Sequence, residues 1–131
     1  MNQEVIPKYL LDTDILADHL ITDFNEESYL IRLLKSGICF TSVLNAAELY
    51  RIAETNSELQ RVNEVLYGIK VLGIHARYSL SVPNHKKRFD NVRDLLFYIL
   101  AESNKLTIVS FNPDKFSYHE VKSLHPGSIV L

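Results

Sequence analysis

Three acidic residues stand where a carboxylate has most potential for chemistry. Asp12 ends the apolar run YLLD, Glu48 lies within VLNAAELY, and Asp94 opens DLLFYILAESNKL. Apolar residues occur on nearly every side of the segment around Glu48, so we expect Glu48 to be largely buried. An unpaired buried carboxylate is costly and prefers to be neutral. Such a charge needs a metal ion or an arginine as its partner.

Each acidic residue also has an interpretation that requires no ligand. Glu48 has the spacing for an i,i+3 pair with Arg51, and Asp94 complements a helix dipole. Either Thr13 or Asp14 is suited to cap the helix that begins ILADHL, and Asp14 is alternatively a metal contact. A strand-end Asp12 before a helix has no comparable structural explanation.

The elements that must position these residues follow from short apolar runs that alternate with helical periodicity. We predict helices around residues 15–20, 29–34, 43–50, 59–66 and 94–106, with Ser42 capping the third. We predict strands at 9–12, 38–42, 69–74, 106–110 and 128–131. Strands alternating with helices indicate an α/β fold, a three-layer α/β/α sandwich with a mostly parallel central sheet. Continuous apolar runs suggest strands buried on both faces. Ligands bind beyond the carboxyl ends of such strands, where Asp12 lies.

Composition limits the class of protein. The 131 residues suit a single domain spanning 1–131, and 47% apolar residues with a net charge of −2 fit a globular chain. A nearly neutral chain does not coat nucleic acid non-specifically. The one cysteine, Cys39, is expected to be a buried free thiol, as in a reducing compartment. We expect a cytoplasmic protein with no secretory signal and no membrane span.

The motifs together resemble the PIN-domain family, and especially its VapC-type toxins. That family opens with an apolar strand ending in Asp-Thr-Asn or Asp-Thr-Ser, here LLDTDIL with Asp14 in the Asn/Ser position. A helix carrying Glu before Leu follows, here FTSVLNAAELYR with Glu48. Near the end, an Asp opens an apolar helix that leads to a strand and a final Asp or Asn, here DLLFYILAESNKLTIVSFNPDKF with Asp94 and Asn112. The resemblance covers nearly the whole chain.

The resemblance implies a metal-dependent ribonuclease, the toxin of a toxin–antitoxin pair. Asp12, Glu48 and Asp94 would hold Mg²⁺ or Mn²⁺, the ions that hard oxygen ligands select. Asn112 or Asp114, in an Asn-Pro turn after a strand, would complete the site or place a water. A basic stretch would position the RNA backbone, although an ordinary solvated loop explains it equally well. Its members are Lys86, Lys87, Arg88 and Arg93. An antitoxin partner and a homodimer are also implied.

Some features depart from the family pattern and leave alternatives open. Asp90 competes with Asp94 for the third acidic role, and Asn112 replaces an acid. One alternative is therefore a PIN-like domain that binds RNA or protein and cleaves slowly or not at all. Another is a phosphatase resembling the haloacid dehalogenases, because LLDTDIL also fits their Asp-x-Asp motif, although Glu48 would then have no role. The histidines show no zinc-ligand spacing, and the sequence has no phosphate-binding Gly-rich loop.

Overall fold

The computed structural model describes residues 5–23 and 25–129. Its centre is a five-stranded sheet with the strand order β3-β2-β1-β4-β5, in which every pairing is parallel. The strands are β1 (Lys8–Leu11), β2 (Ile38–Ser42), β3 (Lys70–Leu72), β4 (Thr107–Val109) and β5 (Ser123–Leu124). The predicted α/β/α sandwich with a parallel sheet is confirmed.

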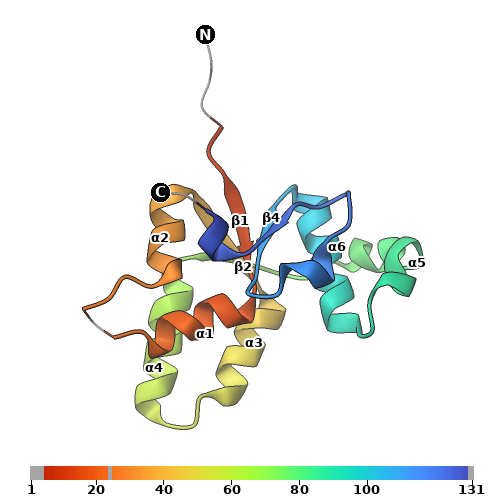
Figure 1. Ribbon diagram of the computed structural model, residues 1–131. Helices are drawn as coiled ribbons and strands as arrows, with labels where there is room; N and C mark the ends of the chain where they lie inside the picture. Colours follow the sequence, from red (N-terminus) through yellow and green to blue (C-terminus); the bar gives the residue numbers. More distant parts are fainter. Residues whose placement is uncertain (1–4, 24, 130–131) are drawn as a thin grey trace.

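The α-helices connect these strands. They are α1 (Thr13–Ile21), α2 (Tyr29–Ser36), α3 (Val43–Ile52), α4 (Asn56–Tyr67), α5 (Val82–His85) and α6 (Val92–Asn104). Figure 1 shows α1 to α4 on one side of the sheet and α5 and α6 on the other. Within residues 5–23 and 25–129, no helix is long and apolar enough to cross a membrane.

Side chains of β1 alternate between two hydrophobic cores, as the pleat of a strand requires. Tyr9 and Leu11 pack with residues of α1 to α4, among them Leu16 and Leu49. Leu10 points the other way, into a core dominated by aromatic residues of α6 and the segment after β4. The sheet is therefore covered on both faces, and Cys39 is a buried free thiol as expected.

The two edges of the sheet differ from the sequence prediction. β3 is an exposed edge strand of three residues, so its apolar run is not buried on both faces. The last strand is Ser123–Leu124, whereas Ser128 ends a 3₁₀ turn that begins at Pro126. The strand predicted at 128–131 is thus wrong in its described part, and residues 130–131 lie outside the described residues. Residues 81–91 contain α5 and another 3₁₀ turn, at Lys86–Arg88, which carries part of the basic stretch.

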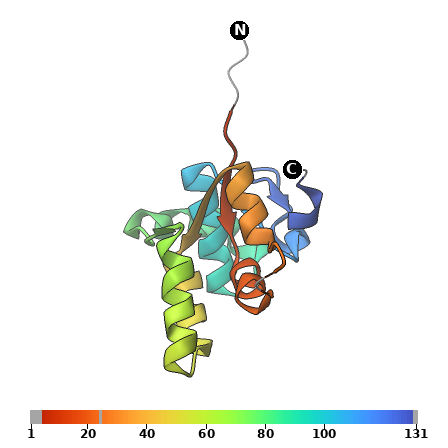
Figure 2. The same ribbon diagram turned by 90° about the vertical axis from the view of Figure 1, so that its left-hand side faces the viewer.

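The strand order places a topological switch point at β1. The chain runs from β1 outward through β2 to β3, then returns to add β4 on the other side of β1. Ligand crevices form where connections leave in opposite directions beyond the carboxyl ends of such strands. α1, α3 and α6 all begin at the carboxyl ends of the strands (Figure 1). In the rotated view of Figure 2, the α3–α4 hairpin projects beyond this end of the sheet.

Candidate functional site

An open depression of about 470 Å³ lies at the switch point. Most of its lining is polar or charged, and its residues come from the starts of α1 and α6, from α3, and from the turn after β4. They are Asp12, Thr13, Asp14, Glu48, Asn91, Arg93, Asp94 and Lys115. The three carboxylates singled out in the sequence therefore meet at one place.

Asp12 is fixed by its position between β1 and α1. Its backbone N–H donates to Val109 of β4, and its side chain caps α1 by accepting from the Thr13 N–H at 2.8 Å. The cap is thus Asp12, and the prediction that Thr13 or Asp14 caps this helix is wrong. A residue before the first helical turn is free to adopt extended backbone, which lets its side chain turn back to the orphan N–H groups. Asp12 is only 4% exposed.

Glu48 is positioned by a well-capped helix. Ser42 caps α3 as predicted, and Asn45 completes the capping box. The buried Asn45 amide then donates to Thr13 Oγ1 at 2.9 Å, and Thr13 Oγ1 donates to Glu48 Oε1 at 2.7 Å. The Glu48 side chain is 45% exposed, so the expectation that it is largely buried is wrong. The helix turns Glu48 toward the open depression, away from the core.

Asp94 lies in the first turn of α6. Asn91 caps this helix by accepting from the Asp94 N–H at 2.8 Å, and the Asn91 amide donates back to Asp94 Oδ2 at 3.1 Å. On its other oxygen, Asp94 faces Lys115 Nζ at 3.6 Å. The carboxylate therefore has ion-pair partners as well as the helix dipole. Asp90 is exposed and does not line the depression.

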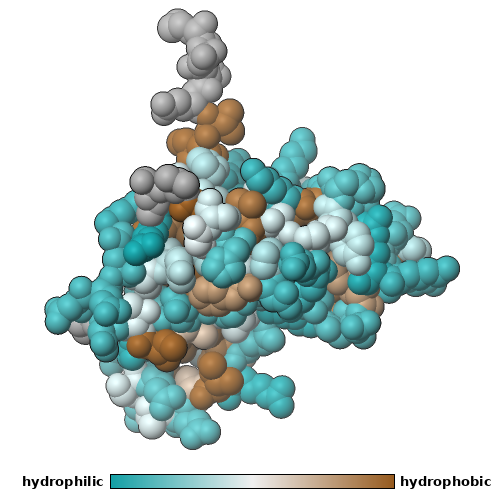
Figure 3. Space-filling model, in the orientation of Figure 1, coloured by the Kyte–Doolittle hydropathy of each residue, from teal (hydrophilic) through white to brown (hydrophobic). Residues whose placement is uncertain are grey.

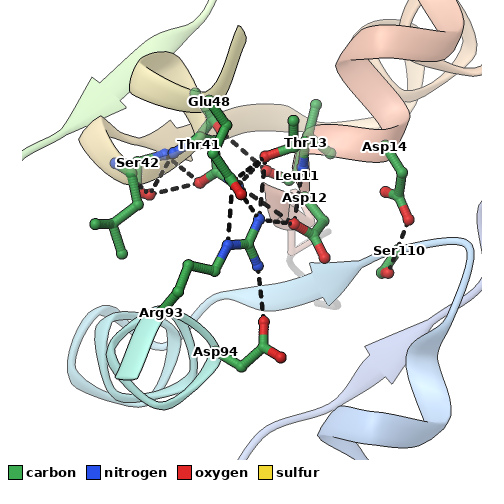
Figure 4. Close-up of polar contacts among 12 residues, drawn as sticks. Leu11, Asp12, Thr13, Asp14, Thr41, Ser42, Glu48, Arg93, Asp94 and Ser110 are labelled. Atoms are coloured by element: carbon green, nitrogen blue, oxygen red, sulfur yellow. Dashed lines mark hydrogen bonds and ion pairs between the residues drawn. The ribbon is translucent and has the colours of Figure 1, made fainter. Parts of the chain in front are cut away.

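Arg93 lies at the centre of the carboxylates, as Figure 4 shows. Its Nη2 donates to Asp12 Oδ1 at 2.5 Å and to Glu48 Oε1 at 2.7 Å, and its Nη1 donates to Asp94 Oδ1 at 3.0 Å. Among the described residues, Glu48 therefore pairs with Arg93, and not with Arg51, which the i,i+3 spacing offered as the ligand-free alternative. Burial on its own lowers the pKa of Arg93, but the hydrogen bond and charge of Asp12, and then those of Glu48, outweigh it and raise that pKa. Arg93 is a permanent cation here.

Asp14 ties α1 to the end of β4. Its Oδ2 accepts from the Phe111 backbone N–H at 3.0 Å and from Ser110 Oγ at 3.2 Å. Its Oδ1 is buried and has no hydrogen-bond partner among the residues that the structure describes. Burial raises the pKa of Asp14, the charge of Asp12 raises it further, and the two hydrogen bonds oppose the shift. Asp14 thus links the start of α1, next to Asp12, to the carboxyl end of β4.

The remaining predicted residues are not part of the lining of the depression. Asn112 and Asp114 do not line the depression. Lys86 and Lys87 are exposed on the 3₁₀ turn before α6. Arg88, in contrast, is engaged, because its Nη1 donates to Glu120 Oε2 at 2.7 Å.

The donor set has the chemistry of a divalent-cation site. Three carboxylates and a hydroxyl are hard oxygen ligands of the kind that Mg²⁺ and Mn²⁺ prefer, and Arg93 already stands among them as a cation. In the part of the chain that the structure describes, however, no three His, Cys, Asp or Glu side chains are close enough together to hold a metal ion. The guanidinium of Arg93 holds these carboxylates apart, because its Nη1 binds Asp94 whereas its Nη2 binds Asp12 and Glu48.

Sequence reasoning missed four residues of the site, namely Thr13, Asn45, Asn91 and Lys115. Thr13 and Asn45 orient the carboxylates, and Lys115 lines the depression. Asn45 had a detectable signal, because Ser42 and Asn45 have the spacing of a capping box. Arg93 was grouped with the RNA-binding residues, whereas its position directly before Asp94 on a helix start placed it beside the acidic cluster.

The fold and site define a small α/β protein with an acidic depression at the switch point of a parallel sheet. Residues 9–121 match the family model of the PIN domain. The chain therefore belongs to the PIN domain family, as the resemblance predicted, and the phosphatase alternative is set aside.

Solved structures support the same fold. The chain is similar to a toxin–antitoxin complex from Klebsiella pneumoniae, with TM-score 0.73 and 18% identity over 90% of this chain and 97% of that one. It is also similar to VapBC-1 from nontypeable Haemophilus influenzae, with TM-score 0.72 and 18% identity over 92% and 99%. VapBC2 from Rickettsia felis, bound to a promoter DNA fragment, has TM-score 0.71 and 19% identity over 90% and 98%. No curated protein sequence matches the chain.

Proposed function

We propose that this PIN domain is a metal-dependent ribonuclease and the toxin of a toxin–antitoxin pair. The observation that carries the proposal is that the carboxylates of Asp12, Glu48 and Asp94 line one depression at the switch point of the sheet. Family membership and the resemblance of the motifs to VapC-type toxins support the same reading.

In this proposal, Asp12, Glu48 and Asp94 hold Mg²⁺ or Mn²⁺. A bound ion of this kind lowers the pKa of water and stabilises charge on a phosphoryl oxygen. The chain itself orients the ligands. Thr13 Oγ1 and the Asn45 amide fix the carboxylates of Glu48 and Asp12 through hydrogen bonds of 2.7 and 3.3 Å.

RNA is held in the proposal by basic side chains beside and beyond the carboxylate cluster. Lys86 and Lys87 are exposed and available to phosphate, and Lys115 lies on the wall of the depression. Arg88 is a weaker candidate than the sequence suggested, because Glu120 already binds it. A water-placing role for Asn112 or Asp114 stays a prediction.

The proposed protein partner is an antitoxin, because the similar solved structures include toxin–antitoxin complexes. The surface offers apolar side chains for such a contact. Ile21 is 82% exposed and Ile52 is 62% exposed, and both border a groove of about 280 Å³ between α1, α3 and α4. Figure 3 shows hydrophobic side chains gathered at the lower left of an otherwise mostly hydrophilic face. A homodimer and a cytoplasmic location stay predictions.

Cleavage of a mixed pool of transfer and ribosomal RNA, with Mg²⁺ or Mn²⁺ and with EDTA, tests the activity. We expect cleavage that needs the metal and that falls about a hundredfold or more in Asp12→Asn and Asp94→Asn. Asp90→Asn is the matched control, because Asp90 is an exposed acid outside the depression, and it should cleave like the wild type. Equal cleavage by the Asp94→Asn protein would contradict the assignment.

The second candidate is a PIN domain that binds RNA or protein without efficient cleavage. The favouring observation is the occupation of the carboxylates by Arg93. Folded wild-type protein, free of any inhibitor, that binds RNA but leaves it intact with Mn²⁺ would establish this alternative.

A further inference from the structure

The guanidinium of Arg93 binds one oxygen atom of each of the three carboxylates that would hold a divalent ion. Its Nη2 contacts Asp12 Oδ1 and Glu48 Oε1, and Nε adds a second hydrogen bond to Glu48 Oε1 at 3.1 Å. Asp12 Oδ1 has no lone pair left for another ligand, because it also accepts hydrogen bonds from the Thr13 N–H and the Asn45 amide. Arg93 and a metal ion therefore cannot both use these atoms.

The side chain of Arg93 also packs against an aromatic ring of its own helix. Its Cζ lies 5.1 Å from the ring centre of Phe97, one helical turn along α6, and the Phe97 ring is fully buried. The side chain of Arg93 is 24% exposed. Arginine does not lose its proton at any physiological pH, so the cluster can be freed only if the side chain moves.

We propose that Arg93 is an internal competitor of the divalent ion, and that this competition sets the affinity of Asp12, Glu48 and Asp94 for metal. The inference rests on the proposed metal site but not on RNA cleavage. With Arg93 in place, the carboxylates are already partly neutralised and are spaced by a guanidinium, so metal binding must include the release of this side chain. Without it, three carboxylates repel one another and gain more from a divalent ion.

Isothermal titration of the metal-free protein with Mn²⁺ alone tests the competition. Arg93→Gln keeps a side chain of similar length without the charge, and we expect it to bind Mn²⁺ about ten- to a hundredfold more tightly than the wild type. Arg77→Gln, an exposed arginine outside the depression, has the same change in net charge and should match the wild type. The double variant Arg93→Gln, Asp12→Asn should lose the gain. Unchanged or weaker binding by Arg93→Gln overturns the proposal.

A second measurement needs no variant and covers the case in which Arg93→Gln does not fold. The Arg93 Nε–H donates to Glu48, so its NMR resonance reports on the ion pair. Mg²⁺ that shifts the Asp12 and Thr13 amides should shift the Arg93 Nε–H with the same midpoint. Amide shifts with an unmoved Arg93 resonance would overturn the proposal. Tighter Mn²⁺ binding by Arg93→Gln without RNA cleavage by any variant would support it while refuting the ribonuclease function.

Discussion

The guanidinium of Arg93 and the carboxylate of Asp12 are joined at 2.5 Å although 81 residues separate them in the sequence. The pair connects the end of β1, the central strand of the sheet, to the start of α6, a helix that covers one face of it. Asp12 is almost fully buried, so the pair carries a desolvation cost that only good geometry offsets. Its consequences reach both the stability of the fold and the chemistry of the depression.

Removing the charge of Arg93 should destabilise the metal-free protein. Asp12, Glu48 and Asp94 would then face one another without their shared cation, and we expect Arg93→Gln to lower the free energy of unfolding by about 1–3 kcal/mol. Urea denaturation in EDTA measures this. Arg77→Gln serves as the control and should stay within about 0.5 kcal/mol of the wild type. An Arg93→Gln protein as stable as the wild type would mean that the carboxylates have another partner.

Asp14 should stabilise the folded protein by joining the start of α1 to the carboxyl end of β4. Asp14→Ala leaves the Phe111 N–H and the Ser110 hydroxyl without their acceptor, so we expect a loss of about 1–2 kcal/mol in unfolding free energy. Asp14→Asn keeps one acceptor oxygen and removes a negative charge beside Asp12. The asparagine variant should therefore be more stable than the alanine variant in thermal denaturation at neutral pH. The reverse order would show that the negative charge itself is needed.

Glu120 should make stability depend on pH in the acid range. The hydrogen bond from Arg88 lowers the pKa of Glu120, burial opposes the shift, the hydrogen bond from Tyr98 lowers it again, and the pKa is about 2 against a usual 4.5. Between these values the unfolded chain binds more protons than the folded one. The contribution of Glu120 to the free energy of unfolding is therefore fully present above pH 4.5 and is lost as the pH falls toward 2.

Glu120→Gln should flatten this part of the curve. Unfolding free energies measured in urea from pH 5 down to 2.5 should fall less steeply for the variant than for the wild type. Glu64→Gln is a suitable control, because Glu64 is an exposed acid on α4. Parallel curves for Glu120→Gln and wild type would contradict the assigned ion pair.

Lys86 and Lys87 should contribute to RNA affinity through phosphate contacts. We expect the double change to Gln to weaken RNA binding and to lower the slope of log affinity against log salt by about 1 to 2. Fluorescence anisotropy over a series of KCl concentrations gives this slope, with the Asp12→Asn background preventing cleavage. Lys70, at the far edge of the sheet on β3, provides the control substitution. An unaltered slope would assign the stretch to a solvated loop.

The fold was predictable because its signals are local. The apolar runs at 9–12 and 38–42 became β1 and β2, and Ser42 caps α3 as its side-chain chemistry requires. β5 was not predictable in the same way, because Ser123 and Leu124 form a strand only through pairing with β4. The apolar residues nearer the carboxyl end gave a stronger local signal, but Pro126 begins a 3₁₀ turn there.

The sequence could predict that the acidic residues lie close together, but not that Arg93 is their shared partner. Asp12 ends a strand and Asp94 begins a helix, so parallel-sheet topology alone brings them to one edge. The partner of Glu48 depends on the direction in which α3 turns its side chain. Arg51 satisfied the local spacing rule, yet Arg93 from α6 reaches the same carboxylate across the sheet edge. Such long-range pairs leave no periodic pattern in a sequence.

Anomalous X-ray diffraction from crystals grown with Mn²⁺ tests the central claim most directly, because it locates the ion and the Arg93 side chain in one map. We predict a manganese peak among Asp12, Glu48 and Asp94, with the guanidinium of Arg93 withdrawn from Asp12. Manganese elsewhere, or a manganese-free cluster in which Arg93 still binds all three carboxylates at saturating Mn²⁺, would contradict the account.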